Sequence, residues 1–185
     1  VYHKSRTLFA LNIAKIKKPA HILCEGYMDV ISMHEAGFDT AVCACGTALT
    51  PEQAKLLSEY ADEVVLSYDS DEAGQKATER SLGILGSTTL KVSVLSYQGE
   101  GPGRVHQEIR AEAFARLLDK SENHIDYRLE QLRGRYDLSD DSQRVEFLRE
   151  ATGVIASLHS AVEREIYGGH AAQAAGVTPE AMAQE

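Results

Sequence analysis

Four short apolar runs alternate with longer segments of helical periodicity over the first half of the chain. An apolar run followed by an amphipathic segment, repeated in this way, is typical of a parallel sheet with helices packed on its faces. We therefore predict an α/β domain over residues 20–110, with a sheet of about four strands. The four runs read AHILCEGY, TAVCACG, EVVLSYD and LKVSVLSY.

The segment TPEQAKLLSEYA shows most clearly where one of these helices begins. Thr50 suits the N-cap position, and Pro51 suits the first helical position, where a backbone N–H has no partner within the helix. Gln53 stands three residues after Thr50 and completes a capping box. The pattern predicts a helix that begins at Pro51.

No strand pattern returns after about residue 111. The segment EAFARLLDK and the three longer segments that follow it read at helical spacing, which predicts a helical subdomain over residues 111–185. Residues 1–19 are predicted to form a basic helix that ends an upstream subdomain. Because the chain begins with Val1 and its last helical pattern stops abruptly, we interpret it as a fragment of a longer protein.

The composition is that of a globular protein, with 43% hydrophobic and 25% charged residues. No run approaches the roughly 18–20 apolar residues of a membrane span, and no secretory signal is visible, so we expect a cytoplasmic protein without membrane contact. Cys24, Cys43 and Cys45 lack the paired spacing of a zinc site or a disulfide framework. They are predicted to be buried, reduced thiols.

The net charge of −9 argues against a protein that holds nucleic acid by its overall electric field. Any contact with phosphate must therefore be local. Basic residues gather near the start of the chain, as His3, Lys4, Arg6, Lys15, Lys17 and Lys18. This uneven distribution is compatible with a solvated helix face and with a site for metal ions and polyphosphate.

Three carboxylates follow predicted strands. Glu25 comes after the first strand, and Asp69 and Asp71 come after the third. Ligands of parallel sheets collect beyond the carboxyl ends of the strands, and residues two apart in an extended segment point to the same side. Carboxylates brought together repel one another, and a divalent cation removes the conflict. Oxygen ligands favour Mg²⁺ or Mn²⁺, so we predict a metal site.

The residues alone leave other interpretations of YDSDEAGQ open. A capping aspartate beside a solvated aspartate is the simplest of them. The acids and Gly74 also match the first, third and sixth positions of an EF-hand loop, but Ala73 and Arg80 occupy its fifth and twelfth positions. A phosphatase-type aspartate nucleophile normally follows the first strand of its sheet, and that interpretation leaves Glu25 without a role.

Three motifs together resemble one family. The segments EGYMDVISMHEAG, GTALTPEQAKLL and YDSDEAGQKAT, in this order, closely resemble the Toprim core of bacterial DnaG-type DNA primases. The segments VYHKSRTLFALNIAK before them, and SENHIDYRLEQL and VEREIY after them, resemble the regions that flank that core. The resemblance covers most of the chain. EGYMD and HKSR distinguish it from the topoisomerases, recombination mediators and nucleases that share the Toprim acids.

The resemblance implies an RNA polymerase that lays primers on single-stranded DNA in replication. Glu25, Asp69 and Asp71 would hold metal ions during nucleotidyl transfer, and Glu25 would also move a proton. Lys4 and Arg6 would hold phosphates.

Several neighbouring residues have less specific roles. Asp29 matches the last acid of EGYMD and belongs either to the surroundings of the metal or to the start of a helix. Gly46-Thr47 matches a Gly-Thr turn of the family. His21, His34 and Tyr68 are interpreted as packing or surface residues, because the two histidines have no partners at ligand spacing.

The resemblance also implies partners. These are a single-stranded DNA template, nucleoside triphosphates, and a replicative helicase contacted through a C-terminal region outside this chain. Zinc is implied only for an upstream domain, also outside this chain. We expect the isolated fragment to be weak or inactive.

One loop departs from the family. After the fourth strand these primases carry a loop similar to GxKDPDEFI, whose two aspartates extend the metal site, whereas this chain reads GEGPGRVHQEIR with Gly101 and Gly103 at the aspartate positions. One set of synonymous codons for this segment, read one nucleotide later, encodes AKDPDEFIKKY. We therefore hypothesise two compensating frameshifts around the loop, to be checked by resequencing. If the glycines are genuine, we expect weaker occupancy of one metal.

Two alternative functions remain. A non-catalytic or impaired Toprim module would bind metal and nucleotide without making primers. Another Toprim enzyme, a nuclease or a topoisomerase, would nick supercoiled DNA.

Overall fold

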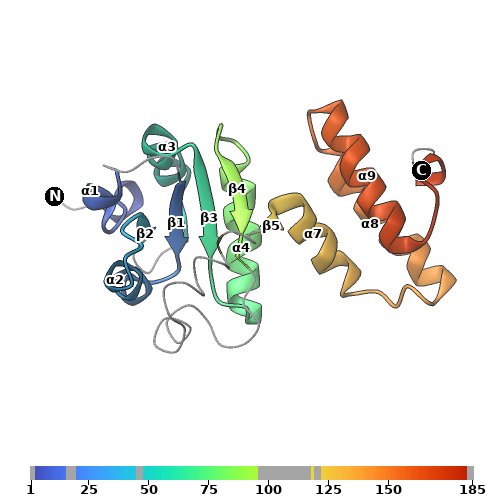
Figure 1. Ribbon diagram of the computed structural model, residues 1–185, viewed down its shortest axis with the longest axis horizontal. Coiled ribbons are helices and arrows are strands. Elements are labelled where there is room, and N and C mark those ends of the chain that lie inside the picture. Colours follow the sequence, from blue (N-terminus) through green and yellow to red (C-terminus); the bar gives the residue numbers. More distant parts are fainter. Residues whose placement is uncertain (1–2, 16–19, 45–47, 96–117, 119–121, 183–185) are drawn as a thin grey trace. The chain divides into compact units, whose positions relative to one another are not determined.

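A computed structural model describes residues 3–15, 20–44, 48–95, 118 and 122–182, and the chain divides into two compact units, residues 1–122 and 123–185 (Figure 1). The predicted domain boundary at residues 110 and 111, and the helix expected at 112–120, lie essentially outside the described residues. The elements of the first unit are η1 (Lys4–Arg6), α1 (Leu11–Ala14), β1 (Ala20–Cys24), α2 (Tyr27–Glu35), β2 (Ala41–Cys43), α3 (Pro51–Tyr60), β3 (Glu63–Ser67), α4 (Glu72–Leu85), β4 (Lys91–Val94) and β5 (Glu122–Asn123), which reaches the boundary between the units.

The sheet has the strand order β2-β1-β3-β4-β5, so β1 and β3 lie at its centre. Strand β1 pairs in parallel with both neighbours: Cys24 lies opposite Cys43 of β2 and opposite Ser67 of β3. Strand β4 pairs in parallel with β3. The four predicted parallel strands are confirmed, and the two-residue strand β5 adds a fifth that was not expected.

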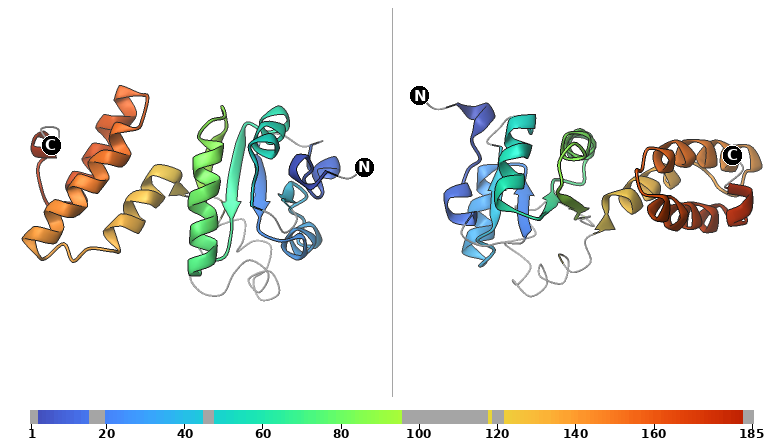
Figure 2. Two further views of the ribbon diagram at one scale, coloured as in Figure 1. Left: turned by 180° about the vertical axis from the view of Figure 1, so that it is seen from behind. Right: turned by 90° about the horizontal axis from the view of Figure 1, so that it is seen from above.

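The connections place helices on both faces of the sheet. The crossover from β1 to β2 runs in one direction along the sheet, and the crossovers from β2 to β3 and from β3 to β4 run in the other. Because parallel crossovers are right-handed, α2 lies on one face and α3 and α4 lie on the opposite face, where they pack against each other (Figure 2). The strands, covered on both faces, are almost entirely buried, as shown by Leu23, Val64 and Leu66.

The single helix predicted for residues 1–19 is wrong over residues 3–15. Residues 4–6 form a short 3-10 turn, and Phe9 makes an antiparallel bridge to Cys43 at the edge of the sheet, with its N–H 2.9 Å from the Cys43 carbonyl oxygen. Ala10 then takes the left-handed conformation, with φ 61°, before the short helix α1. The backbone of this segment therefore bonds to the sheet edge instead of to itself.

The predicted capping box at the start of α3 is present, and it has a second function. The Thr50 N–H donates to Gln53 Oε1 at 3.0 Å, and the Gln53 N–H donates to the Thr50 hydroxyl at 3.2 Å. The fully buried Gln53 amide also donates to the carbonyl oxygens of Lys4 and Thr7, each at 2.8 Å. The Thr50 hydroxyl donates to the Ser5 carbonyl at 2.7 Å. These bonds attach the basic N-terminal turn to the first turn of α3.

The second unit is helical and has its own core. Asn123, Asp140 and Ser160 each cap a helix with their side-chain oxygen, and Gly176 ends one in the left-handed conformation, with φ 67°. Phe147 is fully buried at the centre of the core. The helices are α7 (His124–Arg133), α8 (Asp141–Ala156), α9 (Ala161–Ala175) and α10 (Pro179–Met182).

Across the described residues, no helix combines the length and apolar character required to cross a membrane.

Candidate metal centre

Glu25 and Asp69 follow neighbouring strands at the centre of the sheet. Glu25 comes directly after β1, and Asp69 lies two residues beyond Ser67, the last residue of β3. Since Cys24 is in register with Ser67, the two strands deliver their acids at the same edge. This edge is where parallel sheets place their ligands.

The charges around Glu25 are acidic. Its pKa is raised, first by burial and next by the negative charge of Asp69, with smaller contributions from Asp71 and Asp29. A hydrogen bond from the Asp69 backbone to the Glu25 carboxylate opposes the rise. The pKa of Asp69 is also raised, by burial and then by Asp29 and Asp71. The fold therefore holds four carboxylates in one electrostatic cluster: Glu25, Asp29, Asp69 and Asp71.

Two members of this acidic cluster also cap helices. Asp71 is the N-cap of α4, and its Oδ1 accepts a hydrogen bond from the Gly74 N–H at 2.8 Å. Asp29 lies in the first turn of α2, and its Oδ2 accepts from the Gly26 N–H at 3.0 Å. Each bond engages one carboxylate oxygen and leaves the second one for another ligand. The capping role considered for one of the two aspartates is therefore filled by Asp71, and it does not exclude metal binding.

Gly74 sets the shape of the Asp69 loop, a role that sequence analysis missed. A Cβ atom at Gly74 would lie 2.0 Å from the Asp69 carbonyl oxygen, a distance that no real contact allows. Only glycine lets the start of α4 approach this loop so closely. The spacing of the glycine from the two aspartates is visible in the sequence, but the clash depends on the fold.

The acidic cluster fits a hard divalent cation by the chemistry of its donors. All four groups are carboxylates, and no Lys or Arg in the described part of the chain forms a salt bridge with any of them. As the side chains stand, no three His, Cys, Asp or Glu side chains among the described residues meet around one point where an ion would touch them all. A cation would therefore draw the carboxylates together from their present rotamers.

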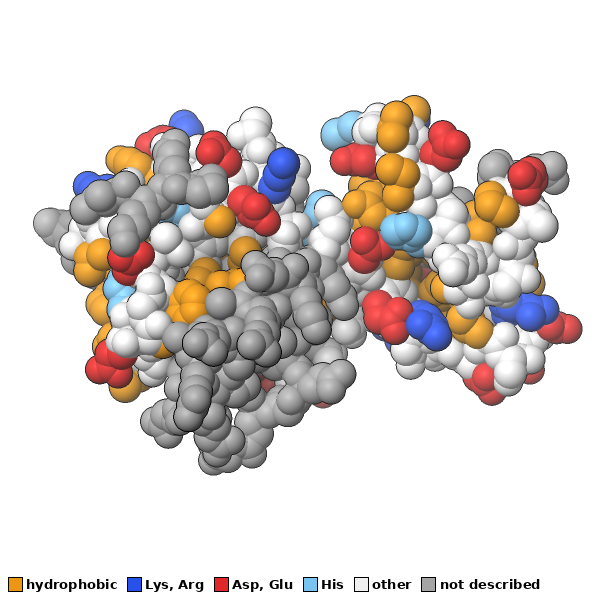
Figure 3. All heavy atoms as spheres, in the orientation of Figure 1, with side chains coloured by type: hydrophobic (Ala, Val, Ile, Leu, Met, Phe, Trp, Pro, Cys, Tyr) orange, Lys and Arg blue, Asp and Glu red, His pale blue; other side chains and the backbone are white. Residues whose placement is uncertain are grey.

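Lys4 and Arg6 are not part of this acidic cluster. They belong to η1, which Gln53 and Thr50 attach to α3. The charged side chains that shift the pKa values of Cys24, Glu25 and Asp69 are all acids or thiols, with no Lys or Arg among them. In Figure 3, acidic and basic side chains are interspersed on the visible described surface, without a basic stripe.

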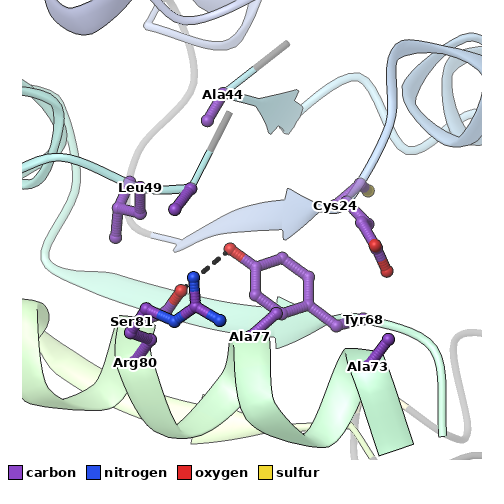
Figure 4. A pocket seen from close by; sticks show the side chains of 10 residues that line it. Cys24, Ala44, Leu49, Tyr68, Ala73, Ala77, Arg80 and Ser81 are labelled. Carbon is purple, nitrogen blue, oxygen red and sulfur yellow. Dashed lines mark hydrogen bonds between the residues drawn. The ribbon is translucent and has the colours of Figure 1, made fainter. Parts of the chain in front are cut away.

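A pocket of about 360 Å³ adjoins Glu25 on the α4 side (Figure 4). Tyr68 lies in its wall, with its hydroxyl 3.1 Å from the Ser81 hydroxyl, and burial raises the Tyr68 pKa to about 12. This phenol therefore stays protonated and serves in packing.

The remaining sequence candidates are buried or hydrogen-bonded within the fold, or they lie outside the described residues. His21 is fully buried in β1, and the ring of His34 bonds to the Ala41 carbonyl at 2.9 Å. Cys24 and Cys43 are buried and reduced, and burial raises the pKa of Cys24. The candidates outside the described residues are Cys45, Gly46-Thr47, Gly101 and Gly103.

Two protein families match the chain. Residues 22–102 match the Toprim-like family, and residues 125–180 match the DnaB-helicase binding domain of primase. The second match falls within this chain, whereas the helicase-binding region was expected outside it.

Individual relatives agree with both matches. The DNA primase of Clostridium acetobutylicum is 35% identical over 170 residues, which cover 90% of this chain and 28% of that protein. The crystal structure of the Aquifex aeolicus primase, with its zinc binding and RNA polymerase domains, is 28% identical, with a TM-score of 0.75; the match covers 100% of this chain and 45% of that one. A DnaG primase catalytic domain bound to single-stranded DNA shares the fold, with a TM-score of 0.80 at 23% identity; the match covers 98% of this chain and 60% of that one.

Proposed function

Because this chain is the Toprim domain and following helical region of a DnaG-type DNA primase, we propose that it takes part in metal-dependent synthesis of RNA primers on single-stranded DNA. The chain spans 28% of the length of its Clostridium relative, so the proposal concerns its share in the activity of a larger enzyme.

The observation that supports the proposal is the acidic cluster at the ends of β1 and β3. Glu25, Asp69 and Asp71 are the proposed ligands of Mg²⁺ or Mn²⁺, and Asp29 supports them from the start of α2. A bound divalent cation supplies positive charge that stabilises the phosphates of the reacting nucleotide.

In nucleotidyl transfer, the 3′-hydroxyl oxygen of the primer bonds to the α-phosphorus of the incoming triphosphate. The bond from that phosphorus to the β-phosphate oxygen breaks, and pyrophosphate leaves with the electron pair. The hydroxyl proton must pass to a base. Glu25 is the proposed acceptor, because a carboxylate with a raised pKa holds a proton more readily than an ordinary one.

The basic turn η1 is the proposed contact for phosphate groups. Lys4 and Arg6 are exposed, and the turn that carries them is held by the buried amide of Gln53. One relative of the same fold is a primase catalytic domain bound to single-stranded DNA, which supports a DNA template as the partner here.

The helical unit is the proposed contact with a DnaB-type helicase, because residues 125–180 match the family described by that interaction. Val162 and Ile166 are the proposed contact residues, since they lie one turn apart on α9 and are 65% and 50% exposed. Replacing both by aspartate should abolish co-purification with the helicase and leave the far-ultraviolet circular dichroism unchanged.

The metal site is tested first by titrating the chain with Mn²⁺ and following the free ion by electron paramagnetic resonance. We expect binding that Glu25→Gln, Asp69→Asn and Asp71→Asn each weaken by at least tenfold, and that Glu59→Gln on the exposed face of α3 leaves unchanged. Unchanged binding in all three acidic variants would contradict the proposed site.

Activity is tested by incorporation of a labelled ribonucleotide on a single-stranded template with Mn²⁺. Incorporation that Glu25→Gln abolishes would support the polymerase function. Because the fragment alone is expected to be weak or inactive, the same assay is run on a longer primase that contains this segment, and Mn²⁺ and nucleotide binding without incorporation in that protein would favour a non-catalytic module. Nicking of supercoiled DNA would favour a nuclease or topoisomerase.

A further inference from the structure

The pocket beside Glu25 is hollow because small side chains surround it. Alanines line it from three segments: Ala44 after β2, Ala48 before α3, and Ala73 and Ala77 on α4. Its volume of about 360 Å³ is within the range of small-ligand sites. Tyr68 forms the wall between the sheet and the helix (Figure 4).

Arg80 is the cation that lines this pocket among the described residues. It extends from α4 and forms no hydrogen bond or ion pair with any of them. Lys76, one turn earlier on the same helix, instead pairs with Glu72 and does not line the pocket. As far as the described residues go, the guanidinium donors of Arg80 are therefore available to a ligand.

The pocket has opposite charges at its two ends. In Figure 4, Arg80 and Cys24 lie on opposite sides of the Tyr68 ring, and Glu25 follows Cys24 directly in the chain. An anionic ligand with several phosphates would meet the proposed cation site at the Glu25 end and Arg80 at the other. Guanidinium groups bind phosphate oxygens through paired hydrogen bonds.

We propose that this pocket binds the terminal phosphates of a nucleoside triphosphate, with Arg80 as their side-chain ligand. The inference rests on the proposed function, because a nucleoside triphosphate is the substrate that the proposed nucleotidyl transfer requires. It adds to that function a binding pocket for the substrate, in which Arg80 contacts the phosphates.

The test measures ATP and AMP affinity of the whole chain in the presence of Mn²⁺ by calorimetry. Arg80→Ala should weaken ATP binding about tenfold or more, because the charge-assisted hydrogen bonds to the phosphates are lost. AMP affinity and Mn²⁺ affinity should stay unchanged. Arg80→Lys should recover part of the ATP affinity.

Two further variants test whether ATP binding depends on the pocket itself and not only on the positive charge of α4. Lys76→Ala removes a positive charge from the same helix outside the pocket and should leave ATP affinity unchanged. Ala77→Leu should weaken ATP binding by filling the pocket without altering any charge. Circular dichroism establishes that each variant is folded.

Several results would overturn the inference. They are failure of ATP to bind the wild-type chain, equal losses in Arg80→Ala and Lys76→Ala, and an equal loss for AMP and ATP. Failure of the proposed function is a different result, because it is seen as absent Mn²⁺ binding in the wild-type chain before any nucleotide is added.

Discussion

At the scale of single residues, Gly74 shapes the Asp69 loop because it has no side chain. Gly74→Ala places a methyl group against the Asp69 carbonyl, 2.0 Å from the built Cβ, so either the loop or the helix must move. We expect a loss of about 1–3 kcal/mol in the free energy of unfolding and a large loss of Mn²⁺ affinity. Urea unfolding and Mn²⁺ titration measure the two effects.

Gly83 provides the matched control on the same helix. Nothing lies within 4 Å of a Cβ built there, and the residue is exposed. Gly83→Ala should stabilise the protein by about 0.5–1 kcal/mol and leave Mn²⁺ affinity unchanged. Equal Mn²⁺ affinity in the two variants would show that Gly74 does not shape the loop.

Glu25 gives the metal-free protein a distinct pH dependence. Its pKa is raised in the folded state, so the folded protein holds this proton more tightly than the unfolded chain does. The contribution to stability is therefore present below the ordinary carboxyl pKa and is lost as the pH rises through the raised value. Glu25→Gln should remove this loss and be more stable than the wild type at neutral pH in EDTA.

Urea unfolding at roughly pH 4 to pH 8 measures this difference. Glu59→Gln is the control, because Glu59 lies exposed on α3. Saturating Mn²⁺ should reverse the order and make the wild type the more stable protein at neutral pH. A constant difference between Glu25→Gln and the wild type at every pH would argue against the electrostatic cause.

At the scale of elements, Gln53 connects a helix start to a segment more than forty residues earlier, as its bonds to Lys4 and Thr7 show. Gln53→Leu removes three hydrogen bonds of a fully buried amide and leaves backbone groups without partners. We expect a loss of about 2–4 kcal/mol in the free energy of unfolding. Hydrogen exchange at the Thr50 amide should also become faster, because that N–H loses its acceptor. The control is Glu52→Gln, at the exposed neighbouring residue, which should show neither effect.

Sequence analysis correctly predicted the elements that local sequence patterns determine. The Thr50 capping box and the alternation of β1, β3 and α4 depend on neighbours in the chain, and they were predictable. The break at Ala10 was not, because alanine favours helices and the positive φ arises from the bridge of Phe9 to the sheet.

Sequence analysis also could not identify elements too short to show a hydrophobic pattern, or residues whose role depends on contacts distant in the chain. Strand β5 has two residues, too few to show any alternation. Arg80 is one of many exposed cations in the sequence, and only the packing of α4 brings it to the pocket. Glu25 and Asp69 could be predicted from the sequence, because each closely follows an apolar run and parallel strands end at a common edge.

At the scale of the whole molecule, two cores predict two separable unfolding reactions. Phe147→Ala should destabilise residues 123–185 by about 3–5 kcal/mol, because the ring is fully buried in the helical core. Mn²⁺ affinity should not change. Thermal unfolding with and without Mn²⁺ measures both, and Mn²⁺ should raise only the transition of residues 1–122.

The control for this variant is Val162→Ala, since Val162 is 65% exposed on the same unit. Its effect should lie within about 0.5 kcal/mol. A single transition shifted by Phe147→Ala and by Mn²⁺ alike would show that the two units unfold as one.

The strand order has a consequence for how such a domain can change over time. Glu25 and Asp69 come from β1 and β3, which have a partner strand on each side, whereas β2 and β5 form the borders of the sheet. Insertions, truncations or new contacts at those borders leave the two inner strands and their register intact. Changes at the borders of the sheet, including added domains, would therefore leave the proposed metal site at its centre in place.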